Sequence, residues 1–100
     1  MRLTGPEVEA IRDCARKRFG DGCVVRLFGS RVDDAKRGGD IDLHIEAQSA
    51  ELAKLANELA FREELRDRIG EQKIDVILRA PGYSPRAIDL IAVRDGVPLS

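Results

Sequence analysis

The stretch "LFGSRVDDAKRGGDIDL", residues Leu27–Leu43, decides how this chain is interpreted. It places Gly29 and Ser30 directly after an apolar segment, and Asp40 and Asp42 one residue apart in a second apolar segment. Side chains alternate between the two faces of a strand, so both aspartates point to the same face. Two carboxylates held side by side repel each other, and a bound cation would relieve that repulsion.

Hydrophobic periodicity around this stretch predicts three helices and four strands that follow one another along the chain. The expected elements are a helix from Thr4 to about Phe19, strands Cys23–Phe28 and Asp40–Glu46, a helix Ser49–Ile69, a strand Lys73–Leu78, a helix Arg86–Ala92 and a last extended piece Val97–Leu99. Thr4 fits a capping box with Glu7, and Ser84 is expected to cap the last helix. This order predicts an α+β fold in which a small sheet carries helices on one face and leaves the other face open.

Length and composition bound the organisation of the chain. One hundred residues with 43% hydrophobic content suit a single domain over residues 1–100. With 17 basic and 18 acidic side chains the net charge is -1, so no overall field attracts nucleic acid or an anionic membrane. No leader-like or membrane-spanning apolar segment is present in the sequence, which favours a cytoplasmic protein. Cys14 and Cys23 each lie in an apolar pattern and are expected to be reduced packing residues.

A third aspartate, Asp75, lies inside the apolar strand segment "KIDVIL". Aspartate is rare in strands, and an unpaired carboxylate is costly to bury, so Asp75 is a candidate functional residue. If this strand pairs beside the one that carries Asp40 and Asp42, the three carboxylates converge. Clustered oxygen ligands suit Mg²⁺, and a pair of such ions can clamp an in-line phosphoryl displacement.

The residues after the first strand supply a candidate phosphate-binding element. Gly29 permits close approach of the backbone to a ligand, and the Ser30 hydroxyl adds a donor. Arg31, Lys36 and Arg37 are candidates for further contacts with a triphosphate, although each is explained equally well as a solvated loop charge.

His44 follows the aspartate pair on the same strand face. A lone histidine is more often structural than functional, so we expect a solvated side chain at the edge of the sheet rather than a residue of the acceptor site.

Taken together, these residues resemble the nucleotidyltransferase superfamily related to DNA polymerase beta, in particular its minimal single-domain branch. The pattern of that family is a glycine and a serine after a strand, an aspartate pair flanked by apolar residues, and a third acidic residue on a later strand. The matching positions in this chain are Gly29, Ser30, Asp40, Asp42 and Asp75. The resemblance implies the palm-like nucleotidyltransferase fold and transfer of a nucleoside monophosphate, usually from ATP, onto a hydroxyl, with release of pyrophosphate.

The resemblance also implies roles for single residues. Asp40 and Asp42 would bind two Mg²⁺ ions, and Asp75 would complete the site, either as general base or only as a metal ligand. Gly29 and Ser30 would hold the β- and γ-phosphates of ATP, with Arg31 as an added nucleotide contact.

Minimal members of the family are commonly paired with a small helical HEPN protein as a toxin–antitoxin system, in which the enzyme adenylylates a tyrosine of the toxin. Two alternatives stay open at this point. The chain could adenylylate a small hydroxylated molecule such as an aminoglycoside, with an acceptor site built across a homo-oligomer, or it could be a non-catalytic nucleotide-binding or masking module. An unpaired sheet edge or a helix face could serve as an interface.

Overall fold

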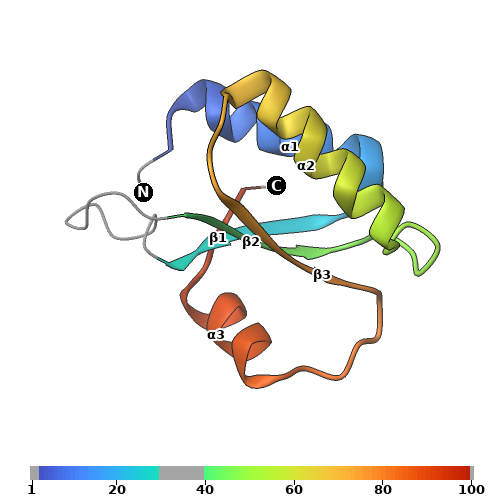
Figure 1. The fold of residues 1–100 in the computed structure, drawn as a ribbon. Coiled ribbons are helices and arrows are strands. Elements are labelled where there is room, and N and C mark those ends of the chain that lie inside the picture. Colours follow the sequence, from blue (N-terminus) through green and yellow to red (C-terminus); the bar gives the residue numbers. More distant parts are fainter. Residues whose placement is uncertain (1–2, 30–39, 100) are drawn as a thin grey trace.

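The structure, a computed structural model, describes residues 3–29 and 40–99 and contains the expected elements in the expected order (Figure 1). Their bounds are α1 Gly5–Phe19, β1 Val24–Phe28, β2 Ile41–Glu46, α2 Leu55–Ile69, β3 Ile74–Arg79, α3 Ala87–Asp95 and β4 Val97–Pro98. Among the described residues no helix is both long and apolar enough to cross a membrane.

The strands form one four-stranded mixed sheet in the order β3-β2-β1-β4. β2 lies in its interior, antiparallel to β1 and parallel to β3. The register places Phe28 of β1 opposite Asp42, and it places Asp42 beside Asp75 of β3. The predicted α+β class with a small mixed sheet is therefore confirmed.

Helices α1 and α2 lie side by side on one face of the sheet and enclose the core (Figure 1). The apolar residues of β2 alternate as predicted, so that Ile41, Leu43 and Ile45 are all buried on this side. The rings of Phe19 and Phe61 join the two helices, with their centroids 5.3 Å apart. The core also contains both cysteines, which are buried; this confirms their predicted role as packing residues.

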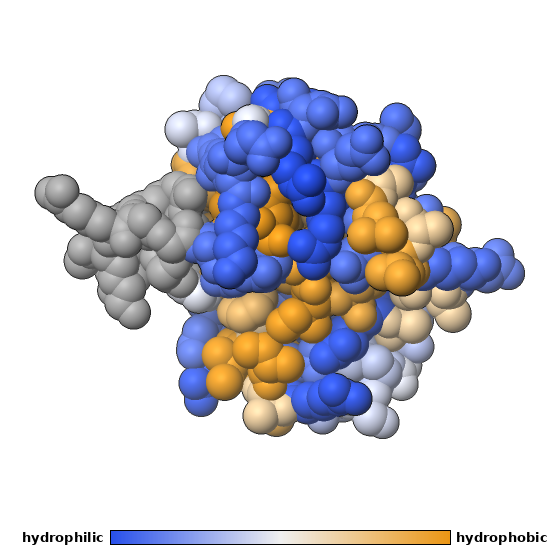
Figure 2. Space-filling model, in the orientation of Figure 1, coloured by the Kyte–Doolittle hydropathy of each residue, from blue (hydrophilic) through white to orange (hydrophobic). Residues whose placement is uncertain are grey.

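The third helix lies on the opposite face of the sheet (Figure 1). This face is therefore only partly open: α3 covers His44 of β2, while Asp42 is half-buried and Asp75 is exposed. Figure 2 shows apolar side chains gathered on the surface over α3. Four of the nine residues of this short helix are large exposed hydrophobic side chains, namely Ile88, Leu90, Ile91 and Val93.

Two helix starts differ from the prediction. Residues 49–54 form turns instead of the first turns of α2, and two of them, Leu52 and Ala53, pack against the core. Ser84 is not the cap of α3, because the helix begins at Ala87 with Arg86 as its capping position. The carboxylate of Asp89 accepts a hydrogen bond from the backbone N–H of Arg86 at 2.8 Å, which fixes the start there. The capping box of Thr4 and Glu7 is confirmed in α1.

Candidate active site

The residue that follows β1 lies against the central carboxylate of the candidate site. Gly29 has a φ of +79°, in the left-handed region that favours glycine. A Cβ atom at this position would lie 2.3 Å from Oδ2 of Asp42. The positive φ favours glycine at this position, and the carboxylate of Asp42 leaves no room for a side chain.

The structure brings the three predicted aspartates together at one end of the sheet. Asp40 immediately precedes β2, Asp42 lies within it, and Asp75 is the parallel neighbour of Asp42 on β3. One carboxylate oxygen from each residue can be chosen so that all three lie within 4.8 Å of one another. Asp40 and Asp42 are half-buried and Asp75 is exposed, so the cluster is open to solvent on the β3 side.

Within the described residues, burial and the neighbouring carboxylates both disfavour the charged form of Asp42. Burial raises the pKa of Asp42 above its ordinary value, and the charges of Asp75 and Asp40 raise it further. Lys73 opposes this effect, since its charge lowers the pKa of Asp42 and its Nζ lies 3.4 Å from Oδ2 of Asp40. The lysine side chain is 73% exposed, however, and an exposed ion pair contributes little. A proton or a cation would relieve the remaining repulsion.

The donor set indicates which cation would fit. All three groups offer carboxylate oxygens, and within the described part of the chain no histidine or cysteine joins the cluster. Hard oxygen ligands select Mg²⁺ or a similar ion over metals that prefer nitrogen or sulfur. Mg²⁺ binds through one or two carboxylates and keeps positions for water and substrate phosphates, which suits a cluster that is open on one side.

Of the predicted phosphate-binding residues, the structure describes only Gly29. Ser30 and Arg31 lie outside the described residues, as do Lys36 and Arg37. Gly29 itself is exposed and immediately follows the end of β1, next to the carboxylates. The predicted element therefore begins at the end of the sheet where the carboxylates lie.

The prediction for His44 is wrong. The side chain is fully buried, because β2 is an interior strand and α3 packs over this position. Its Nε2 lies 2.8 Å from Oδ1 of Asp89, which is buried as well. The same carboxylate accepts hydrogen bonds from Nε of Arg79 at 2.9 Å and from the backbone N–H of Arg86. Burial alone would raise the pKa of Asp89, but these donors together lower it to about 2.

Sequence reasoning missed Asp89 entirely. The available signal was an acidic residue inside the apolar segment "AIDLIAV", which is the same kind of signal that singled out Asp75. The two residues differ in surroundings: Asp75 is exposed beside other carboxylates, whereas Asp89 is enclosed by donors. Asp89 is therefore structural, since it joins α3 to the sheet.

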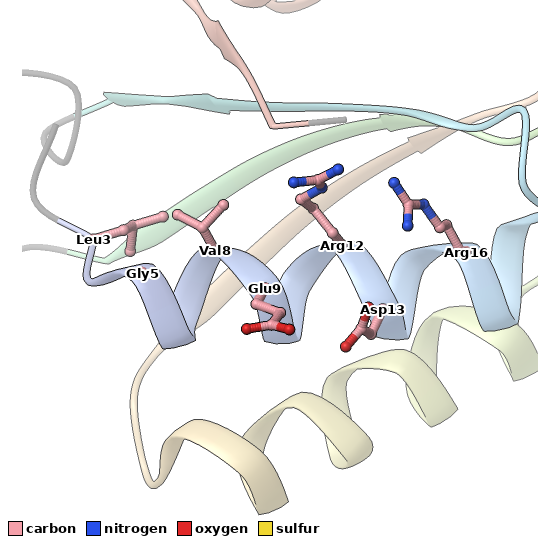
Figure 3. A pocket seen from close by; sticks show the side chains of 7 residues that line it. All are labelled: Leu3, Gly5, Val8, Glu9, Arg12, Asp13 and Arg16. Atoms are coloured by element: carbon pink, nitrogen blue, oxygen red, sulfur yellow. The ribbon is translucent and has the colours of Figure 1, made fainter.

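Two hollows on the protein surface were compared with the position of the aspartate cluster. One runs along α1, where Arg12 and Arg16 point to one side of the helix and Glu9 and Asp13 to the other (Figure 3). None of the three clustered aspartates lines this hollow. The other hollow lies at the start of β3 and contains Asp75 itself. Its remaining lining residues are Arg62, Arg66, Glu71, Gln72, Lys73 and Ile74, so three cationic side chains flank the outer side of the cluster.

The chain matches no model of a known protein family, and a search of curated proteins found no relative of significant similarity.

Proposed function

We propose that this chain is a Mg²⁺-dependent nucleotidyltransferase that moves AMP from ATP onto a hydroxyl group. We propose further that the acceptor is a tyrosine of a helical HEPN-type partner, so that the chain acts in the cytoplasm as an antitoxin by protein adenylylation. The observation that carries the proposal is the convergence of Asp40, Asp42 and Asp75 from two neighbouring strands, with ligand oxygens within 4.8 Å of one another. The choice of a protein acceptor rests on the resemblance of the sequence pattern to the minimal branch of the superfamily.

In this proposal Asp40 and Asp42 hold two Mg²⁺ ions, and Asp75 completes the site on the exposed side. When bound, the ions would neutralise charge on the triphosphate and on the reacting oxygens. The rigid pairing of β2 with β3 fixes the relative positions of Asp42 and Asp75, so the site needs little rearrangement before reaction. Gly29 and Ser30 hold the β- and γ-phosphates and turn the α-phosphorus toward the acceptor.

The proposed transfer is a balanced displacement at the α-phosphorus. A new bond forms between the acceptor oxygen and the α-phosphorus, while the bond from that phosphorus to the bridging oxygen of the β-phosphate breaks. Pyrophosphate leaves with the electron pair. The proton of the acceptor hydroxyl passes to Asp75 or to solvent, and Asp75 is the exposed carboxylate of the three.

The test is incubation of the purified chain with Mg²⁺ and α-labelled ATP, alone and with a purified small helical protein of the HEPN type. Mass spectrometry of both proteins should find one AMP adduct on a tyrosine of the partner. The adduct should disappear with Asp42→Asn, Asp75→Asn or a chelator. Asp67→Asn, which alters an exposed carboxylate on α2, serves as the matched control and should keep full activity.

Three other outcomes would change the proposal. Tight binding of the partner without an adduct would indicate a masking module. Failure of both binding and modification would direct the search to small hydroxylated acceptors, tested with the same labelled ATP. Retention of transfer by Asp42→Asn would rule out the carboxylate cluster as the catalytic site.

A further inference from the structure

Lys73 is the cationic side chain that forms an ion pair with the acidic cluster in the described part of the chain. Its Nζ lies 3.4 Å from Oδ2 of Asp40, and its charge lowers the pKa of Asp42. The lysine is mostly exposed, so the pair adds little to the stability of the fold. Its ammonium group beside a candidate metal and nucleotide site is therefore better explained by ligand binding than by folding.

The backbone fixes Lys73 beside the cluster. Lys73 immediately precedes β3, as Asp40 immediately precedes β2. The backbone N–H of Ile41 donates to the carbonyl of Lys73 at 3.0 Å, which extends the parallel pairing of the two strands by one step. Lys73 therefore stands beside Asp40 as Asp75 stands beside Asp42. Three carboxylates and one ammonium group thus come from four neighbouring positions at one end of the sheet.

The two other cations that line the hollow at the start of β3 are placed differently. Arg62 is engaged within the fold: its Nη2 lies 3.2 Å from Oε2 of Glu58, and its Nη1 donates to the carbonyl of Ile74. Arg66 is exposed on α2, and among the described residues it makes no ion pair with the cluster. Lys73 is therefore the cation best placed to meet a ligand that lies over the three carboxylates.

Binding of Mg²⁺ would change the surroundings of this ammonium group. A metal ion held by Asp40 and Asp42 takes the carboxylate oxygens for itself and repels a second cation. The side chain of Lys73 is 73% exposed, so it is free to turn away from Asp40. Lysine combines a flexible stem with three donors and commonly binds phosphate, and the phosphates of a bound nucleotide would be the nearest anions.

We propose that Lys73 is a phosphate-binding residue, whose ammonium group leaves Asp40 when Mg²⁺ binds and donates to a non-bridging oxygen of the α-phosphate of ATP. This inference rests on the proposed nucleotidyltransferase function. Gly29 lies on the β1 side of Asp42 and Lys73 on the β3 side, so the α-phosphoryl group would be held between them. A cation at this position stabilises the charge that develops on the phosphoryl group during transfer.

Calorimetric titration with two ligands tests the proposal: Mg²⁺ alone, and the α,β-methylene analogue of ATP, which cannot transfer AMP, in the presence of saturating Mg²⁺. Lys73→Met should bind Mg²⁺ slightly more tightly than the unaltered chain but the analogue about tenfold more weakly, because a hydrogen bond from a charged group is lost. Lys73→Arg keeps a cation and should retain most of the affinity for the analogue. Lys54→Met makes the same change at an exposed lysine before α2 and should affect neither ligand.

The opposite signs of the two effects identify a phosphate-binding role. Unchanged affinity of Lys73→Met for the analogue would overturn the inference and leave the proposed function standing. Weaker binding of both ligands would mean that Lys73 only organises the carboxylates, and an equal loss in Lys54→Met would mean a general effect of charge; either result would also overturn it. An unaltered chain that binds Mg²⁺ but not the analogue would contradict the proposed function itself, and this inference with it.

Discussion

A Cβ atom on Gly29 would lie 2.3 Å from Oδ2 of Asp42, well inside van der Waals contact. The backbone that leaves β1 is therefore held directly against the central carboxylate of the acidic cluster. This contact links the two halves of the sequence motif, which are separated along the chain but adjacent across the β1–β2 pair.

Gly29→Ala should destabilise the chain through both backbone strain and collision with Asp42. The strain alone costs about 1–2 kcal/mol. Gly82→Ala separates the two effects, because Gly82 also has positive φ but a Cβ there meets nothing within 4 Å. Chemical denaturation should show a larger loss for Gly29→Ala than for Gly82→Ala. Equal losses would mean that Asp42 moves aside without cost.

Mg²⁺ should raise the Tm of the unaltered chain and should leave the Tm of Asp42→Asn nearly unchanged, since a ligand that binds only the folded state stabilises it. Without metal, Asp42→Asn should be at least as stable as the unaltered chain at neutral pH, because one of three mutually repelling charges is removed. Differential scanning fluorimetry with and without Mg²⁺ measures both effects. A similar metal response in the two proteins would place the ion elsewhere.

Asp42 should make the free energy of unfolding of the metal-free chain fall as the pH rises. Its folded-state pKa lies above the ordinary value of 3.8, so the folded state binds the proton more tightly than the unfolded state. This contribution is favourable at low pH and is lost as the pH rises from 3.8 through the folded-state pKa. Urea denaturation at several pH values should show the slope in the unaltered chain and a smaller one in Asp42→Asn.

Asp89 should have the opposite dependence. Its pKa is lowered from 3.8 to about 2, so its contribution is fully present above 3.8 and is lost as the pH falls toward 2. The contribution is roughly 2 kcal/mol, as expected for a shift of this size. Asp89→Asn should therefore be clearly destabilising at pH values above 3.8, with the difference from the unaltered chain shrinking in acid. Asp95→Asn, an exposed change on the same helix, should have little effect at either pH.

Lys73→Met should make the site bind Mg²⁺ more tightly. The ammonium group lies 3.4 Å from Asp40 and competes with a cation for the same negative field. Because the lysine is mostly exposed, the gain should be less than about 1 kcal/mol. Titration with Mg²⁺ followed by calorimetry measures this change. Weaker binding after the substitution would mean that Lys73 organises the carboxylates instead of competing for them.

Local patterns in the sequence were sufficient to predict the order of the helices and strands and the three aspartates of the candidate site. The period of two in "DIDLHIE" places Asp40 and Asp42 on one face and buries Ile41, Leu43 and Ile45 on the other, as the structure shows. The predicted starts of two helices were less accurate, because side-chain contacts set where these helices begin. Helix α3 begins at Ala87 because the Asp89 carboxylate accepts a hydrogen bond from the backbone N–H of Arg86. Helix α2 begins only at Leu55, because the residues before it form turns that pack on the core.

The sequence by itself determined features that depend on neighbours along the chain: strand alternation, the capping box of α1, and a glycine at the end of β1. Tertiary structure decided which strands pair and what covers them. It placed Asp75 beside Asp42 through the parallel register of β3, and it buried His44 under α3 against Asp89. Periodicity records only whether a residue faces a core, whereas the identity of its neighbour across the sheet depends on contacts between residues distant in sequence.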